Sequence, residues 1–298
     1  MRKMTFLSSF FIKILALLFM TLDHLGLFFL EFMYDPDIVE LANVFRLLGR
    51  LALPLFAFMI VEGVMHTKSI GKYTLRLGIM ASLISTLYII LEYSNNFHDF
   101  DSLLRAGNIF LDLLLLAIAV YCLKHPNWKI KLITLLPVAF SILSFIVKMI
   151  ETAEIIDIHW FPAFITLQYD WLTIFLGLGF YCAYLLADAY IKVLEPQTGL
   201  SKDIWISQGN YRILVNIIAV VLGSIVHFLY YGCVYIWPTY IFWDYHTQIY
   251  AILSGAFILL YSGKRGYNAK WFQYGSYLYY PLHLLAILVI YVIIYGGI

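Results

Sequence analysis

The chain has 298 residues, of which 63% are hydrophobic and only 12% are charged, and its formal net charge is +1. Together with a mean hydropathy of +0.86, this composition excludes a water-soluble globule and an intrinsically disordered chain. The small net charge provides no overall field that would favour nucleic acid. Apolar runs of about 20 residues recur along the whole length, which predicts an all-α, polytopic bundle embedded in a lipid bilayer.

Hydropathy predicts about nine membrane spans, or ten if an additional aromatic segment enters the membrane. The nine lie at residues 10–32, 43–65, 73–92, 106–123, 130–150, 169–191, 211–235, 245–262 and 271–296. Two aromatic stretches, residues 154–167 and 233–245, are candidate interfacial or re-entrant segments. No polar linker and no clear internal repeat divides the chain, so we expect one domain over residues 1–298.

Lysine and arginine residues gather in alternate connections between the predicted spans, and acidic residues gather in the others. Because connections rich in lysine and arginine remain in the cytoplasm, we expect a cytoplasmic N-terminus and, for an odd number of spans, a C-terminus outside. The expected location is therefore the cytoplasmic membrane, crossed many times.

The first predicted span contains an adjacent ionisable pair, Asp23 and His24, and Lys13 lies eleven positions before the histidine. Eleven residues are close to a whole number of helical turns, so Lys13 and His24 lie on one stripe, roughly 16–17 Å apart along the axis. Asp23 points about 100° away, toward a different neighbour. Ionisable groups inside a span cost about 2.5–3.5 kcal/mol each on insertion scales and usually mark function. The alternative is a polar pair that only locks helix packing.

Other predicted spans also carry polar residues, most of them at a similar depth in the outer half of the membrane. They are Arg46, Arg50, Glu62, Asp112, Gln248 and His283, with Glu62 deeper toward the cytoplasm. Four of them have a simpler interpretation. Arg46 could extend to the outer headgroups, and Glu62 could pair with a basic neighbour. His283 could be a satisfied core histidine, and Asp112 could cap or pair locally.

This set of residues suits acyl transfer. A buried imidazole can take a proton from an attacking hydroxyl or amine, a carboxylate can orient it, and an arginine can stabilise an oxyanion. Basic residues at the cytoplasmic end suit the phosphates of a cofactor such as coenzyme A; they are Lys13, Lys72, Arg76, Lys264 and Arg265. The distance from Lys13 to His24 is comparable with an extended pantetheine arm.

No metal site is expected. The three cysteines, Cys122, Cys182 and Cys233, lie in or near apolar spans without CxxC spacing, which favours buried inert thiols. No histidine, cysteine or carboxylate spacing resembles a structural zinc set.

Several segments resemble the TraX family of membrane proteins, and the resemblance covers most of the chain. The segments are IKILALLFMTLDHLGLFF (residues 12–29), FRLLGRLALPLFAFMIVEG, HTKSIGKYTLRL, YSGKRG and YLYYPLHLL. The family is similar to the wider transmembrane acyltransferases, whose first helix often carries a basic residue, ten intervening residues and a histidine, as Lys13 and His24 do.

The resemblance implies an acetyltransferase that uses acetyl-CoA, and a family member is associated with N-terminal acetylation of a conjugative pilin. Carried over by position, it implies that His24 is the base, that Asp23 is its neighbour and that His283 is the histidine of the terminal motif. The remaining polar residues of the motifs are Lys13, Arg46, Arg50 and Glu62.

We therefore expect an integral-membrane acetyltransferase that moves acetyl from cytoplasmic acetyl-CoA to an amine or hydroxyl of an extracytoplasmic or membrane-embedded acceptor, such as the N-terminus of a pilin-like or small peptide. A cell-surface glycan is an alternative acceptor. A proton-coupled transporter, with Asp23, His24, Arg50 and Glu62 as a relay, is the alternative of another class, although transporters commonly show paired repeats. A non-catalytic membrane assembly factor is the third alternative.

Overall fold

The computed structural model describes residues 5–33, 35–93, 107–152, 161–236 and 245–295. These residues form helices and, apart from an isolated bridge between Leu7 and Tyr261, no β-structure. The prediction of an all-α membrane protein is therefore confirmed. The predicted re-entrant segments 154–167 and 233–245 lie partly outside the described residues; the described part of the first contains the short 3-10 helix η2 (Ala163–Ile165).

Six helical stretches in the described part of the chain are long and apolar enough to cross a membrane, judged by length and composition. One of them joins two helices, α2 and α3, and another includes the short α7 (Trp128–Leu132). The helices are α1 (Ser9–Phe32), α2 (Pro36–Gly49) with α3 (Ala52–His66), α4 (Ile70–Tyr93), α8 (Leu135–Thr152), α9 (Trp171–Thr198) and α11 (Asn210–Ile236).

Of the three other predicted spans, two match single helices and one does not. Residues 106–123 contain α6 (Ile109–Lys124), and residues 271–296 correspond to α14 (Lys270–Tyr295). The expectation of one continuous span over 245–262 is wrong, because this stretch is divided into α12 (Tyr245–Gln248), the 3-10 helix η3 (Ile249–Ser254) and α13 (Gly255–Leu259). A further short helix, α10 (Lys202–Ser207), connects α9 and α11.

The predicted span 43–65 is also corrected, both at its start and in its middle. It begins earlier, at Pro36, because Asp35 caps the helix through the backbone N–H of Asp37 and proline is favoured in the first turn. It is interrupted between Gly49 and Ala52. Pro54 explains the interruption, since proline has no N–H to donate to the carbonyl four residues earlier, at Arg50, and its ring crowds that carbonyl.

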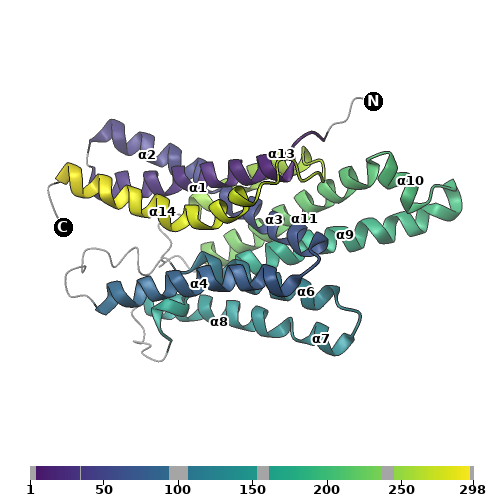
Figure 1. Ribbon diagram of the computed structural model, residues 1–298, viewed down its shortest axis with the longest axis horizontal. Helices are drawn as coiled ribbons and strands as arrows, with labels where there is room; N and C mark the ends of the chain where they lie inside the picture. The colour runs from purple at the N-terminus through teal and green to yellow at the C-terminus, as the bar shows by residue number, and fades with distance from the viewer. Residues whose placement is uncertain (1–4, 34, 94–106, 153–160, 237–244, 296–298) are drawn as a thin grey trace.

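The connections of the bundle are sorted by charge between its two ends. Figure 1 shows the start of α1, the α3–α4 connection, α7, α10 and the loop after α13 at one end, on the right. These are the connections that carry the predicted lysine and arginine sets. The α1–α2 connection and the last turn of α14 lie at the opposite end. The structure thus agrees with the sorted charges, while the direction of the bundle in the membrane remains a prediction.

Helix α3 lies inside the bundle. It packs against α1, α6 and α9, and Phe58 contacts Phe180 of α9 and Tyr261 edge-to-face. By contrast, the outer faces of helices such as α4 expose apolar side chains, including Leu75 and Ile79. A surface of this kind fits contact with lipid rather than water.

Candidate functional site

Helices α1 and α2 approach closely where a buried ion pair forms between them. Two glycines permit this approach, since a methyl group at Gly26 would press on Arg46 and the Ala42 carbonyl, and one at Gly49 would overlap Asp23. The Asp23 carboxylate forms ion pairs with both arginines: Oδ2 lies 2.9 Å from Nη1 of Arg46, and Oδ1 lies 2.9 Å from Nη2 of Arg50. The three residues are 7%, 7% and 6% exposed, so two positive charges and one negative charge share an interior site.

On another face of α1, His24 contacts α14. The Nε2 atom of His283 lies 2.9 Å from Nδ1 of His24, and Nδ1 of His283 lies 2.9 Å from the carbonyl oxygen of Tyr279. Because a carbonyl only accepts, Nδ1 of His283 carries a proton, and in its neutral form Nε2 accepts from Nδ1–H of His24. The lone pair of His24 then resides on its own Nε2, the nitrogen available to a substrate. The expectation that Asp23 and His24 face different neighbours is confirmed.

Aromatic rings hold the two imidazoles in place. Tyr279 stacks on His283 with ring centroids 5.2 Å apart and 10° between the planes, and its hydroxyl lies 2.7 Å from the hydroxyl of Thr21 on α1. Tyr280 presents its ring to both imidazoles, at 5.8 Å from His24 and 5.5 Å from His283. The pair is therefore oriented by packing on α14 as well as by its hydrogen bond.

Gln248 joins this group, since Arg50 Nη1 lies 3.5 Å from its side-chain oxygen. The structure thus brings together six of the residues selected from sequence, which we call the histidine–arginine site: Asp23, His24, Arg46, Arg50, Gln248 and His283.

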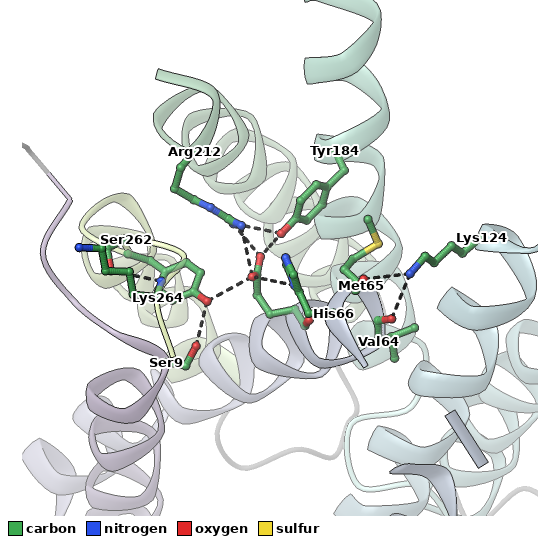
Figure 2. Close-up of polar contacts among 11 residues, drawn as sticks. Ser9, Val64, Met65, His66, Lys124, Tyr184, Arg212, Ser262 and Lys264 are labelled. Atoms are coloured by element: carbon green, nitrogen blue, oxygen red, sulfur yellow. Dashed lines mark hydrogen bonds and ion pairs between the residues drawn. The ribbon is translucent and has the colours of Figure 1, made fainter. Parts of the chain in front are cut away.

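Glu62 belongs to a different cluster, whose members Arg212, Tyr184 and His66 are labelled in Figure 2. It forms a two-point ion pair with Arg212, at 2.7 and 3.3 Å, and also accepts from the hydroxyls of Tyr184 and Tyr261. His66 lies 3.7 Å from the same carboxylate. Glu62 is ten residues along α3 from Ala52, about 15 Å toward the basic end. The structure therefore matches the simpler interpretation of Glu62, a carboxylate paired with a basic neighbour.

Asp112 has a local role as well. Its carboxylate accepts the backbone N–H groups of Gln168, at 2.7 Å, and Tyr169, at 3.2 Å. A nearby ion pair between Lys148 and Asp170, 3.1 Å long and buried, was not selected from sequence. Lys148 falls inside the predicted span 130–150, so the rule that ionisable residues in spans carry a role would have found it.

The predicted cofactor residues lie at the basic end. The loop that contains Lys264 and Arg265 wraps the start of α1, where Ser9 N–H donates to the Lys264 carbonyl at 2.8 Å. Gly266 in this loop has a φ of +70°, which favours glycine. Lys13 is close enough to Arg265 for their charges to interact. On α4, Lys72 is exposed, and the Arg76 guanidinium lies 5.2 Å from the ring centre of Tyr274.

No group of three or more histidine, cysteine or carboxylate side chains that could hold a metal ion occurs among residues 5–295 outside the gaps in the description. Of the cysteines, Cys122 is buried, whereas Cys182 and Cys233 are exposed on the outer faces of their helices. The expectation that all three thiols are buried is therefore wrong for two of them, because apolar runs do not distinguish an interior face from a lipid face.

The long apolar helices and the buried ionisable residues define a multi-pass α-helical membrane protein with a polar site inside its bundle. The chain belongs to the TraX family: the family described as "TraX protein" matches residues 8–291. It is also 33% identical, over 116 residues, to the "Probable fimbrial assembly protein FimC, serogroup H1" of Dichelobacter nodosus. That alignment covers 38% of this chain and 45% of the relative, so the chain spans less than half of the relative's length. No solved structure matches the chain.

Proposed function

We propose that the protein is a membrane acetyltransferase that moves acetyl from acetyl-CoA to an amine or hydroxyl acceptor at the histidine–arginine site. The observation that carries the proposal is the hydrogen bond of 2.9 Å between His24 and His283. It assigns the proton of His24 to Nδ1 and leaves Nε2 as a base.

In the proposed reaction, His24 Nε2 takes a proton from the acceptor while the acceptor nitrogen or oxygen attacks the thioester carbonyl. The carbon–sulfur bond then breaks, the acetyl group remains on the acceptor, and coenzyme A leaves with the proton that His24 returns to its sulfur. His283 keeps the imidazole of His24 in the productive tautomer and becomes more strongly bonded to it when His24 is charged. The arginines beside Asp23 supply positive potential where the carbonyl oxygen becomes negative.

The donor is proposed to enter from the basic end. Its phosphates are negatively charged, and Lys13, Arg76 and Arg265 offer cations there. Lys13 and His24 lie on the same helix, roughly 16–17 Å apart along its axis, a span that an extended pantetheine arm can bridge.

The acceptor is proposed to be the N-terminal amine of a pilin-like or other small exported peptide. The printed name of the relative from Dichelobacter nodosus, a probable fimbrial assembly protein, supports an acceptor of this class. A cell-surface glycan hydroxyl remains the alternative acceptor, and mass spectrometry of fimbrial subunits and envelope polymers from a deletion strain separates the two.

The test uses the full chain purified in detergent and supplied with radiolabelled acetyl-CoA. We expect acetyl-CoA to raise the melting temperature and His24→Ala to lower acetyl transfer by about 10²–10⁴-fold. His227→Ala is the control, because His227 is a buried histidine whose Nδ1 contacts the carbonyl four residues earlier, that of Gly223, as Nδ1 of His283 contacts that of Tyr279, but it lies outside the histidine–arginine site.

The absence of stabilisation by acetyl-CoA, together with unchanged product acetylation in a His24→Ala strain, would contradict the enzyme proposal. Proton flux into proteoliposomes without acetyl transfer would favour the transporter alternative. Loss of folding in His24→Ala would support a packing role for the pair.

A further inference from the structure

The ion pair of Glu62 with Arg212 lies at the basic end of the bundle, beside loop 262–266, which follows α13 (Figure 2). Glu62 is 4% exposed. The Arg212 guanidinium lies 5.4 Å from the ring centre of Tyr184 and 5.1 Å from that of Tyr261. Since the carboxylate compensates its charge and two rings lie against it, Arg212 is engaged within the protein rather than offered to an anion from outside.

Tyr261 ties this ion pair to the start of α1. Its hydroxyl donates to Oε2 of Glu62 at 3.2 Å and lies 2.9 Å from the hydroxyl of Ser9. Its backbone carbonyl accepts from the side-chain amide of Asn216 on α11 at 2.8 Å. Because Tyr261 directly precedes loop 262–266, these contacts with α1, α3 and α11 fix the point where the loop begins.

The loop itself is held from two sides. Ser262 donates through its N–H and through its hydroxyl, each at 2.8 Å, to a carbonyl just before α1. Two N–H groups in the first turn of α1 donate to the carbonyls of Lys264 and Arg265, at 2.8 and 3.1 Å. On the other side, a methyl group at Gly263 would lie only 3.0 Å from Nε of Arg212. The backbone of Lys264 and Arg265 is thus fixed, while both side chains are exposed.

Helix α3 connects this cluster with the histidine–arginine site. Arg50 of that site lies two residues before α3 begins, and Glu62 lies ten residues beyond its start, about 15 Å along the axis. On α1, Lys13 and His24 are separated by a similar length, roughly 16–17 Å. Two helices therefore give the same separation between the basic end and the site, and an extended pantetheine arm can bridge it.

We propose that loop 262–266 binds the phosphates of the donor and that Glu62 is a positioning residue, which acts through Arg212 and Tyr261 to hold this loop against α1. This inference rests on the proposed acetyltransferase function and identifies how the protein distinguishes coenzyme A from a shorter thiol. Cationic side chains on a backbone that is already fixed bind phosphate at a smaller cost in conformational entropy.

Two properties of the cluster favour this role. A buried ion pair adds little net stability compared with apolar packing, so the pair of Glu62 with Arg212 serves the geometry of the loop more than the stability of the fold. The first N–H groups of α1 already donate to loop carbonyls. The side chains of Lys264 and Arg265, rather than the N-terminus of α1, are therefore the groups that contact the anion.

Equilibrium binding tests the positioning role without the acceptor. Binding of radiolabelled acetyl-CoA to the full chain in detergent gives the Kd of the donor, and competition by pantetheine, which lacks the phosphates, gives the Kd of the arm alone. The variant is Tyr261→Phe, which retains the ring and removes only the hydroxyl between Glu62 and Ser9. Tyr211→Phe is the matched control, since it removes a hydroxyl that is bonded to Asp188 at 2.8 Å.

We expect Tyr261→Phe to raise the Kd of acetyl-CoA about tenfold, the effect of one charge-assisted hydrogen bond, and to leave the Kd of pantetheine unchanged. A variant that only disturbed the fold would weaken the binding of both. The double substitution Lys264→Ala and Arg265→Ala should also raise the Kd of acetyl-CoA. In that background Tyr261→Phe should add no further rise, because the loop acts through those cations. Tyr211→Phe should retain both wild-type values.

The outcomes separate this inference from the proposed function. Wild-type protein that does not bind acetyl-CoA overturns both. If the wild type binds acetyl-CoA, an unchanged Kd in Tyr261→Phe, or an equal rise for pantetheine, overturns the positioning role alone, and so does a further rise in the combined variant. If Tyr261→Phe is poorly folded, Ser262→Ala replaces it, because it removes the hydroxyl that anchors the loop. An unchanged Kd of acetyl-CoA in that variant then overturns the proposal.

Discussion

Two adjacent residues of α1 contact two different helices. Successive residues of an α-helix point about 100° apart, and here Asp23 faces the arginines of α2 whereas His24 faces His283 of α14. The division allows one turn of helix to contribute a carboxylate that compensates two buried guanidiniums and an imidazole that retains a lone pair. A carboxylate paired directly with His24 would instead favour the protonated imidazole.

Removal of the Asp23 charge should destabilise the protein. Asp23→Asn takes the carboxylate from two buried arginines, and breaking a buried ion pair on one side costs about 3–5 kcal/mol. Thermal unfolding in detergent measures the loss, with Asp37→Asn as the exposed control. A variant that melts at the wild-type temperature would show that the arginines find equivalent compensation elsewhere.

At the scale of elements, the site depends on how closely α1 and α2 pack. A helix interface without side chains at Gly26 and Gly49 lets the backbones approach, and this approach brings Arg46 within hydrogen-bond reach of Asp23. The interruption after Gly49 adds to this, because it turns the chain at Arg50 so that α2 lies beside α1 while α3 continues into the core.

Glycine 49 provides a direct test of the packing. Gly49→Ala places a methyl group against the Cβ and carboxylate of Asp23. We therefore expect the free energy of unfolding to fall by about 1–3 kcal/mol, as for overpacked cores, and the melting temperature to fall with it. Gly71→Ala is the matched control on α4, since a methyl group there meets nothing within 4 Å and alanine is the better helix former. Equal effects of the two substitutions would show that the α1–α2 contact is looser than the structure indicates.

At the scale of the whole molecule, charge is separated along the bundle. The basic connections lie at the end where α1 begins, and the proposed donor route runs from that end to the histidine–arginine site (Figure 1). On the proposed function, the donor enters from the basic end, and an exported acceptor would reach the site from the opposite end.

Cysteine labelling tests this orientation. In a background without native cysteines, Lys129→Cys on α7 and Asp37→Cys on α2 place one exposed thiol at each end. A membrane-impermeant maleimide added to intact cells should label the thiol at position 37 and not the one at position 129, because basic connections remain in the cytoplasm. The reverse pattern would invert the bundle and the proposed donor route.

Much of the helical framework could be predicted, and the errors have identifiable causes. Each of the predicted spans corresponds to one helix or to a run of short helices in the described residues. The early start at Pro36 and the interruption before Ala52 follow from capping and from Pro54, which hydropathy does not register. The hydrogen-bond partners of the non-helical residues 166–170 could not be anticipated, since they come from α6 and α8 rather than from neighbours in sequence.

The sequence by itself determined the class of protein, the family and the two directions of Asp23 and His24, because hydropathy, motif and helical periodicity are local properties. Only the tertiary structure decided the partners. It joined His24 to a histidine 259 residues away and assigned Glu62 to Arg212. The physical reason is that a buried polar group is stabilised by whichever group packing places within hydrogen-bond distance, and that depends on the arrangement of helices remote in sequence.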